Sequence, residues 1–122
     1  MLNPVVETAA RKLASKLRAA PPIAAFSRAR EALEADEEAQ RLLADLQRRQ
    51  QALLLKQQDG RAIAPEELSA LRALQGEVRR SRTIMAYVEA RREAQAFLPT
   101  VNLTISELLG FDFGALASSG GR

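Results

Sequence analysis

Hydrophobic residues recur at intervals of three and four along most of the chain, which is the spacing of one face of an α-helix. The first such run follows Asn3 and Pro4, a capping side chain and then a residue whose φ is fixed at the first helical position. The pattern stops at about Ala20, because Pro21 and Pro22 cannot continue a helix. It predicts a first helix with an apolar face made of Val6, Ala9, Ala10, Leu13 and Leu17.

Two further helices are predicted on either side of Asp36. The earlier one begins near Pro22 and carries Ile23, Phe26 and Leu33 on one side. Asp36 is a capping side chain followed by two glutamates, and negative charge in the first turn stabilises the start of a helix. Beyond it a coiled-coil seam recurs alternately at four and three residues, and it consists of Ala39, Leu43, Leu46, Gln50, Leu53 and Gln57.

The segment "DGRAIAP" separates this helix from a fourth one. Gly60 suits the position after a helix end, and Pro65 suits the first turn of the helix that follows. The fourth helix extends to Arg80, with a stripe formed by Leu68, Leu71, Leu74 and Val78. A short loop between two amphipathic helices predicts an antiparallel helical hairpin.

The last predicted helix begins at Thr83 as a cap and contains Pro99, a residue that usually kinks or ends a helix. The sequence "VNLTI" after it alternates like a strand, but no other segment could pair with it. We therefore expect a continued, kinked helix through residue 109. Gly110 ends it, and residues 110–122 are rich enough in glycine and serine to predict a flexible tail. The pattern predicts an all-α fold, a bundle of about five helices, with a single domain over residues 1–109.

One line of sequence occurs twice, as "PIAAFSRAREALEA" at 22–35 and "TIMAYVEARREAQA" at 83–96. An aromatic ring one turn from small alanines lets two helices approach closely, so both copies indicate helix packing rather than a ligand site. Phe26 and Tyr87 are therefore predicted to be mostly buried, in related environments that a dimer could bring together. The matched pairs are Ile23 with Ile84, Ala25 with Ala86, Phe26 with Tyr87, Ala29 with Ala90, and Arg30 with Arg91.

Composition predicts association between chains. The length of 122 residues is that of one domain, and 47% of the residues are hydrophobic, but 23 of them are alanines. Alanine favours helix and adds little buried area, so a single copy would have a thin core for the entropy that folding must offset. We expect a homo-oligomer.

The residue types present exclude many kinds of chemistry. The sequence has no cysteine and no histidine, which removes thiol nucleophiles, disulfides, imidazole bases and most zinc sites. Four acids could place carboxylates on neighbouring helix faces, but di-metal bundles use a Glu-x-x-His pattern, so a solvated acidic turn is preferred. No catalytic, cofactor or metal residue is predicted, and we expect no enzyme activity. The acids are Glu31, Glu34, Glu37 and Glu38.

The charge is basic but evenly spread. The net charge is +3, and the basic residues are interspersed with fifteen acids. An arginine stripe could bind RNA, although only Tyr87 lies nearby for base stacking, so this is the alternative function. No signal-like start and no apolar stretch long enough to cross a bilayer are apparent, which favours a cytoplasmic protein. The arginines are Arg79, Arg80, Arg82, Arg91 and Arg92.

The order of these elements resembles the YlbF/YmcA family of bacterial regulators over about residues 3–109. The most specific part is "PIAAFSRAREALEADEEAQRLLADLQ" at 22–47, where a helix rich in alanine runs into an acidic turn and a leucine stripe. The long hairpin and "TIMAYVEARREAQAFL" follow in the same order. The resemblance rests on the order and spacing of these elements and not on any single motif.

The resemblance implies a non-catalytic adaptor that forms dimers or mixed oligomers with paralogous subunits. It further implies control of an endoribonuclease in mRNA maturation, with effects on competence, biofilm formation and sporulation. Some relatives bind an Fe-S cluster through cysteines, which this chain lacks. A chaperone-like clamp formed by the hairpin is a further alternative.

Residues predicted to form an oligomer or partner interface come from three parts of the chain: the repeated line, the coiled-coil seam and the tail. The tail crowds apolar side chains between residues 108 and 116, and they must fold back or dock on another chain to leave water. We favour docking. The predicted interface residues are Phe26, Leu43, Leu46, Leu53, Ile84, Tyr87, Arg91, Phe111 and Phe113.

Overall fold

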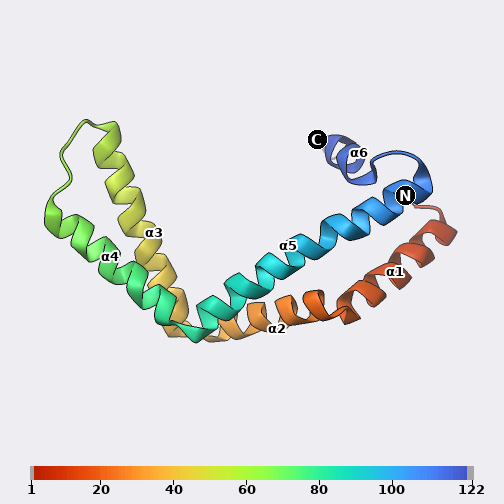
Figure 1. Cartoon of the computed structure of the whole chain (residues 1–122), viewed down its shortest axis with the longest axis horizontal. Coiled ribbons are helices and arrows are strands. Elements are labelled where there is room, and N and C mark those ends of the chain that lie inside the picture. The colour runs from red at the N-terminus through yellow and green to blue at the C-terminus, as the bar shows by residue number, and fades with distance from the viewer. Residues whose placement is uncertain (1, 121–122) are drawn as a thin grey trace. The chain divides into compact units, whose positions relative to one another are not determined.

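The computed structural model describes residues 2–120 and shows six α-helices and no strand among them (Figure 1). The predicted all-α fold is confirmed, and five of the helices lie where the sequence pattern places them. The sixth was not predicted. The helices are α1 (Pro4–Ala19), α2 (Pro21–Ala35), α3 (Glu37–Gln58), α4 (Pro65–Arg80), α5 (Arg82–Leu109) and α6 (Phe113–Gly120).

Two compact units make up the chain. Residues Met1–Phe26 and Glu89–Arg122 form one, which we call the terminal unit, and Ser27–Val88 form the other, the central unit. Helices α2 and α5 each contribute residues to both units. Each unit is described by itself below, and the single domain over residues 1–109 stays a prediction.

Side chains cap the helices α1, α3 and α5. Asn3 Oδ1 accepts the Val5 N–H at 2.8 Å, and Asp36 Oδ1 accepts the Ala39 N–H at 3.0 Å, as the sequence predicts. The cap of α5 was wrongly predicted, because Ser81 Oγ rather than Thr83 accepts an N–H group of its first turn, that of Ile84, at 3.2 Å. The Thr83 side chain instead forms a hydrogen bond with Asp36. Ser81 takes the role because it is the last residue before the helix and keeps its backbone extended.

Helices α3 and α4 form the predicted antiparallel hairpin (Figure 1). Gly60 has a φ of +71°, a conformation that suits glycine at the end of a helix. Across the loop, Lys56 Nζ lies 2.5 Å from Glu67 Oε1, which also accepts the Ala64 N–H at 3.1 Å. One carboxylate therefore joins the end of α3, the loop and the start of α4.

This carboxylate gives the hairpin a pH dependence. The hydrogen bond from Lys56, and then that from the Ala64 N–H, hold the pKa of Glu67 below its ordinary value of 4.5. Because its folded pKa is lowered, its stabilising contribution is complete above pH 4.5 and is lost as the pH falls through the folded pKa. In acid titrations followed by circular dichroism, Glu67→Gln is expected to lose less stability below pH 4.5 than the wild type. Equal losses in the two proteins would show that Glu67 does not couple the hairpin to pH.

The core is thin, and it differs between the units. The central unit buries Ala39, Leu74 and Ile84, with exposed fractions of 2%, 9% and 2%. In the terminal unit only Ala90 and Ala94 are buried among the described residues. Among its described residues, the terminal unit therefore has no large side chain fully removed from water.

Helix α5 continues through Pro99 to Leu109, which confirms the helical interpretation of residues 100–109 over the strand. Pro99 is exposed, so the carbonyl that loses its helical partner there lies close to solvent.

Helix α6 occupies residues 113–120 of the segment predicted to be a flexible tail, and the flexibility of residues 110–122 stays a prediction. Asp112 starts this helix, because its Oδ1 accepts the Ala115 N–H at 3.1 Å. Gly110, with a φ of +85°, makes the turn between α5 and α6. The glycine and serine content of this segment argued against a helix. The capping residue Asp112 was the one sequence signal for α6.

Candidate functional site

An apolar groove lies in the terminal unit between α1, α5 and α6. It has a volume of about 540 Å³, and we call it the terminal groove. Gln95 and Asn102 are its polar side chains, whereas the rest of its lining is mostly aliphatic or aromatic. Its apolar lining includes Leu13 and Leu17 from α1, Leu98, Val101 and Ile105 from α5, and Phe113 from α6.

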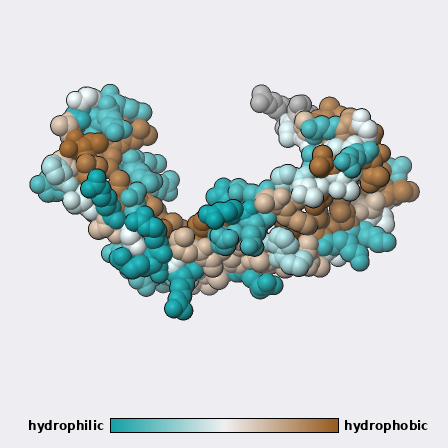
Figure 2. Space-filling model, viewed as in Figure 1, coloured by the Kyte–Doolittle hydropathy of each residue, from teal (hydrophilic) through white to brown (hydrophobic). Residues whose placement is uncertain are grey.

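Around this groove the terminal unit leaves many large apolar side chains in contact with water. Eleven exposed ones belong to this unit and five to the central unit. Figure 2 shows hydrophobic surface gathered where Figure 1 places α1 and α6. The eleven are Leu2, Val5, Val6, Leu13, Leu98, Leu103, Leu108, Leu109, Phe111, Phe113 and Leu116. Monomeric soluble proteins rarely expose large contiguous apolar patches, and such patches often mark binding sites.

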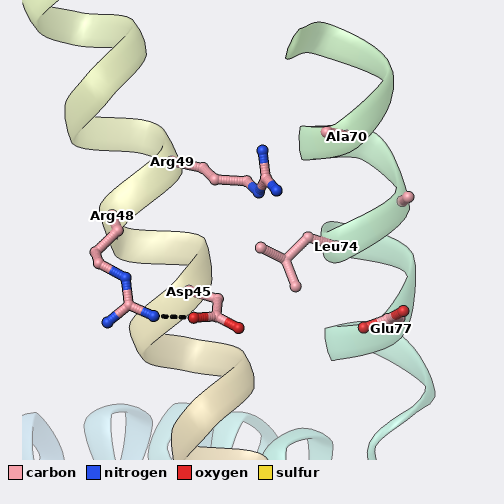
Figure 3. Close-up of a pocket in the computed structure, with 7 residues that line it drawn as sticks. Asp45, Arg48, Arg49, Ala70, Leu74 and Glu77 are labelled. Atoms are coloured by element: carbon pink, nitrogen blue, oxygen red, sulfur yellow. Dashed lines mark hydrogen bonds and ion pairs between the residues drawn. The ribbon is translucent and has the colours of Figure 1, made fainter. Parts of the chain in front are cut away.

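A second hollow, the hairpin notch, lies between α3 and α4 in the central unit (Figure 3). It has a volume of about 520 Å³, and the buried Leu74 is part of its wall. Arg48 forms an ion pair with Asp45, while Arg49 and Glu77 pair with no described residue. The notch offers both signs of charge, which suits polar side chains of a protein partner. Ala70 and Ala73 complete the lining.

A smaller hollow lies where α3 begins and α4 ends, and it contains Asp36 and Glu38. The Ala39 N–H, and then the Thr83 side chain, lower the pKa of Asp36 by hydrogen bonding. Both bonds favour the ionised carboxylate, so Asp36 acts as a helix cap and not as a proton donor near neutral pH. No group of three or more potential metal-ligating side chains occurs in the described part of the chain.

The predicted interface residues divide between the two units, with Phe26, Arg91, Phe111 and Phe113 in the terminal unit and the other five in the central unit. Ile84 is buried, five others are half-buried, and Arg91 is exposed. Phe111 and Phe113 are 49% and 43% exposed, and of all the predicted residues only Phe113 lines the terminal groove. Their role in an interface stays a prediction. The half-buried residues are Phe26, Leu43, Leu46, Leu53 and Tyr87.

The sequence reasoning missed most of the terminal groove. Leu13 and Leu17 were recognised only as one face of α1, and Leu98, Val101 and Ile105 were not singled out. Their spacing of three and four along α5 was the available signal. Pro99 and the strand-like "VNLTI" instead argued against a continuous helical face in this segment.

The five arginines of the predicted stripe are all exposed, but they divide between the units. Arg79, Arg80 and Arg82 belong to the central unit, whereas Arg91 and Arg92 belong to the terminal unit. Arg92 Nη1 lies 3.1 Å from Glu89 Oε2. None of the described helices combines the length and the apolar character that crossing a membrane requires.

The residues of the hairpin notch, and those of the terminal groove except Phe113 and Gly114, lie within a stretch that matches a known family. A family model described as "Control of competence regulator ComK, YlbF/YmcA" matches residues 6–109. The chain belongs to this family. The predicted resemblance is thereby confirmed, and the YlbF/YmcA match includes α2 to α5 and nearly all of α1, whereas α6 lies beyond it.

The chain is also similar to a protein of another bacterium and to a solved structure. A UPF0342 protein of Desulfitobacterium hafniense is 32% identical over 82 residues, which are 67% of this chain and 63% of that protein. The chain thus spans less than two thirds of the length of this relative. A solved structure, a protein of unknown function (DUF964) from Bacillus stearothermophilus, has a TM-score of 0.54 at 24% identity. The likeness covers 86% of this chain and 92% of that one, and it shows a shared fold.

Proposed function

We propose that the protein is a non-catalytic regulatory adaptor that associates with itself and acts by binding other proteins. The observation that carries this proposal is the terminal unit, which buries only Ala90 and Ala94 and exposes eleven large apolar side chains. Its membership of a family described by competence control supports a regulatory role.

Burial of this exposed apolar surface would provide the free energy for self-association. Full burial of a leucine or phenylalanine side chain stabilises a protein by roughly 1.5 to 3 kcal/mol, so a few of the eleven exposed side chains would offset much of the cost of association. The terminal groove would receive a second copy of the chain.

Helix α1 is basic, and the turn between α5 and α6 is acidic. These opposite charges favour a second copy of the chain over an unrelated chain as the occupant of the groove. Helix α1 carries Lys12, Lys16 and Arg18, which form no ion pair with any described residue. The end of α5 and the start of α6 carry Glu107 and Asp112. A two-fold axis would bring the basic helix of each copy against the acidic segment of the other, as an interface built from one patch on both subunits requires.

The partner that the adaptor regulates is expected to bind the hairpin. Its notch carries Arg49 and Glu77, neither of which forms an ion pair with a described residue, and Leu54, Leu55 and Leu68 are exposed along the same two helices. The family resemblance points to an endoribonuclease that acts in mRNA maturation. A second copy of this chain would take the place of paralogous helical subunits. The chemistry of the notch suits a helix with both acidic and basic side chains.

Light scattering of the purified protein tests the self-association. At low micromolar concentration the mass is expected to be at least twice the 13.4 kDa of one chain. A monomer at every concentration would contradict the proposal.

The same tagged protein, purified from its own organism, tests the regulatory partner. An endoribonuclease is expected to be recovered with the wild type and lost with Arg49→Glu, while Arg41→Glu, an exposed change on the same helix, serves as the matched control. Recovery of RNA that resists a high-salt wash, without any protein partner, would favour the RNA-binding alternative instead.

A further inference from the structure

Helix α6 is attached to α5 by polar contacts from two side chains. Asn102 Oδ1 accepts the Gly114 N–H at 2.7 Å, and Ser106 Oγ, one turn further along α5, accepts the Phe113 N–H at 2.9 Å. The first N–H groups of a helix have no partner within the helix. Here α5 supplies partners for two of them, and we call Asn102 and Ser106 the α6 seat.

Asp112 completes this arrangement. Its Oδ1 accepts the Ala115 N–H at 3.1 Å and lies 3.4 Å from Asn102 Nδ2, which donates to it. The Ala115 N–H, and then the Asn102 amide, hold the pKa of Asp112 below its ordinary value. The Asn102 amide therefore uses its oxygen and its nitrogen on two different groups of the same short segment, which fixes where α6 begins.

Gly114 fits this seat because it has no side chain. A Cβ at this position would lie 2.8 Å from Asn102 Oδ1 and 3.1 Å from Asn102 Cγ, so the Asn102 side chain would have to move away from the Gly114 N–H. Gly114 is a helical residue without a positive φ, so the constraint comes from space and not from backbone conformation.

The seat holds α6 without burying its apolar side chains. Phe111 and Leu116 are 49% and 61% exposed, and Phe113 is 43% exposed while lining the terminal groove. Because polar contacts hold α6 in place, its exposed apolar side chains remain available to contact another chain. It also lies beyond the residues that match the family model.

We propose that the α6 seat is a positioning device for self-association, in which Asn102 and Ser106, with Gly114 fitted against Asn102, hold Phe113 as one wall of the groove that receives a second copy of the chain. This inference rests on the proposed self-association and adds the residues that set its strength. Without the seat, α6 would move about Gly110 and the groove would lose its aromatic wall.

The test compares dimer dissociation constants by analytical ultracentrifugation of the full chain. Asn102→Ala and Gly114→Ala are each expected to raise the constant about tenfold or more, because N–H groups at the start of α6 lose their partners. Gly114→Ala is especially informative, since alanine favours helix over glycine, so weaker association could not be ascribed to a less helical α6. Phe113→Ala, which keeps the backbone N–H, should weaken association similarly.

Two controls match these variants. Thr104→Ala changes an exposed α5 side chain that bonds only the Thr100 carbonyl of its own helix, and Gly76→Ala adds a Cβ with ordinary contact to Arg80 in α4. Neither should change the dissociation constant. The double variant with alanine at 102 and 114 should bind no worse than Asn102→Ala alone, because the atom that the new Cβ meets has gone.

The outcomes separate this inference from the function on which it rests. A wild type that stays monomeric would overturn both. A wild-type dimer whose dissociation constant is unchanged in Asn102→Ala and Gly114→Ala would overturn the seat and leave self-association standing. If the free energy of association lost in the double variant equalled the sum of the losses in the two single variants, the seat would also be contradicted, because only independent contacts give additive losses.

Discussion

Replacing Ile84 by alanine is expected to lower the free energy of unfolding by about 2 to 5 kcal/mol, the usual range for a buried isoleucine. Ile84 is 2% exposed and is the largest fully buried side chain among the described residues. In a chain whose other buried side chains are mostly alanines, few contacts can compensate for the cavity. Chemical denaturation measured by circular dichroism gives the change.

The neighbouring Met85 provides the control for Ile84. It has a side chain of similar size on the same turn of α5, but it is 39% exposed. Met85→Ala should therefore cost much less, because less apolar area leaves contact with protein. If both variants lost the same free energy, burial in the central unit would not be what Ile84 contributes.

Ile84 also shows how far the repeated line of sequence predicts structure. Its counterpart Ile23 is only half-buried, as are Phe26 and Tyr87, which were expected to be mostly buried. The boundary between the two units falls inside both copies, after Phe26 in the first and after Val88 in the second. The pattern correctly indicates two helix starts, those of α2 and α5, but a sequence repeat cannot fix how much of each ring another helix covers.

Helices were predictable from the sequence because their signals are local. Asn3 and Asp36 cap the helices that they precede, and Gly60 ends α3, each through bonds to residues close in sequence. The terminal groove was not predictable, because it needs Leu13 and Leu98 to lie on one surface although they are far apart in the chain. The α6 seat was hidden for the same reason, since Asn102 and Gly114 are twelve residues apart across a turn.

Deleting residues 110–122 is expected to convert the oligomer into single chains while changing the melting temperature of the central unit little. The deletion removes Phe111, Phe113 and Leu116, whose exposed apolar area would otherwise be buried on association at roughly 1.5 to 3 kcal/mol for each side chain that is fully covered. It also removes one wall of the terminal groove. Light scattering and thermal unfolding of the same sample measure both effects.

The oligomeric mass and the melting temperature together distinguish docking of the tail on a second copy from packing on its own chain. All buried side chains that were found lie outside the deleted segment, at Ala39, Leu74, Ile84, Ala90 and Ala94. The deletion therefore leaves the core of each unit complete, and the lost free energy should appear in the mass. A truncated protein that keeps its oligomeric mass and melts at a much lower temperature would show instead that α6 stabilises its own chain, and docking on a second copy would then be the wrong account of the tail.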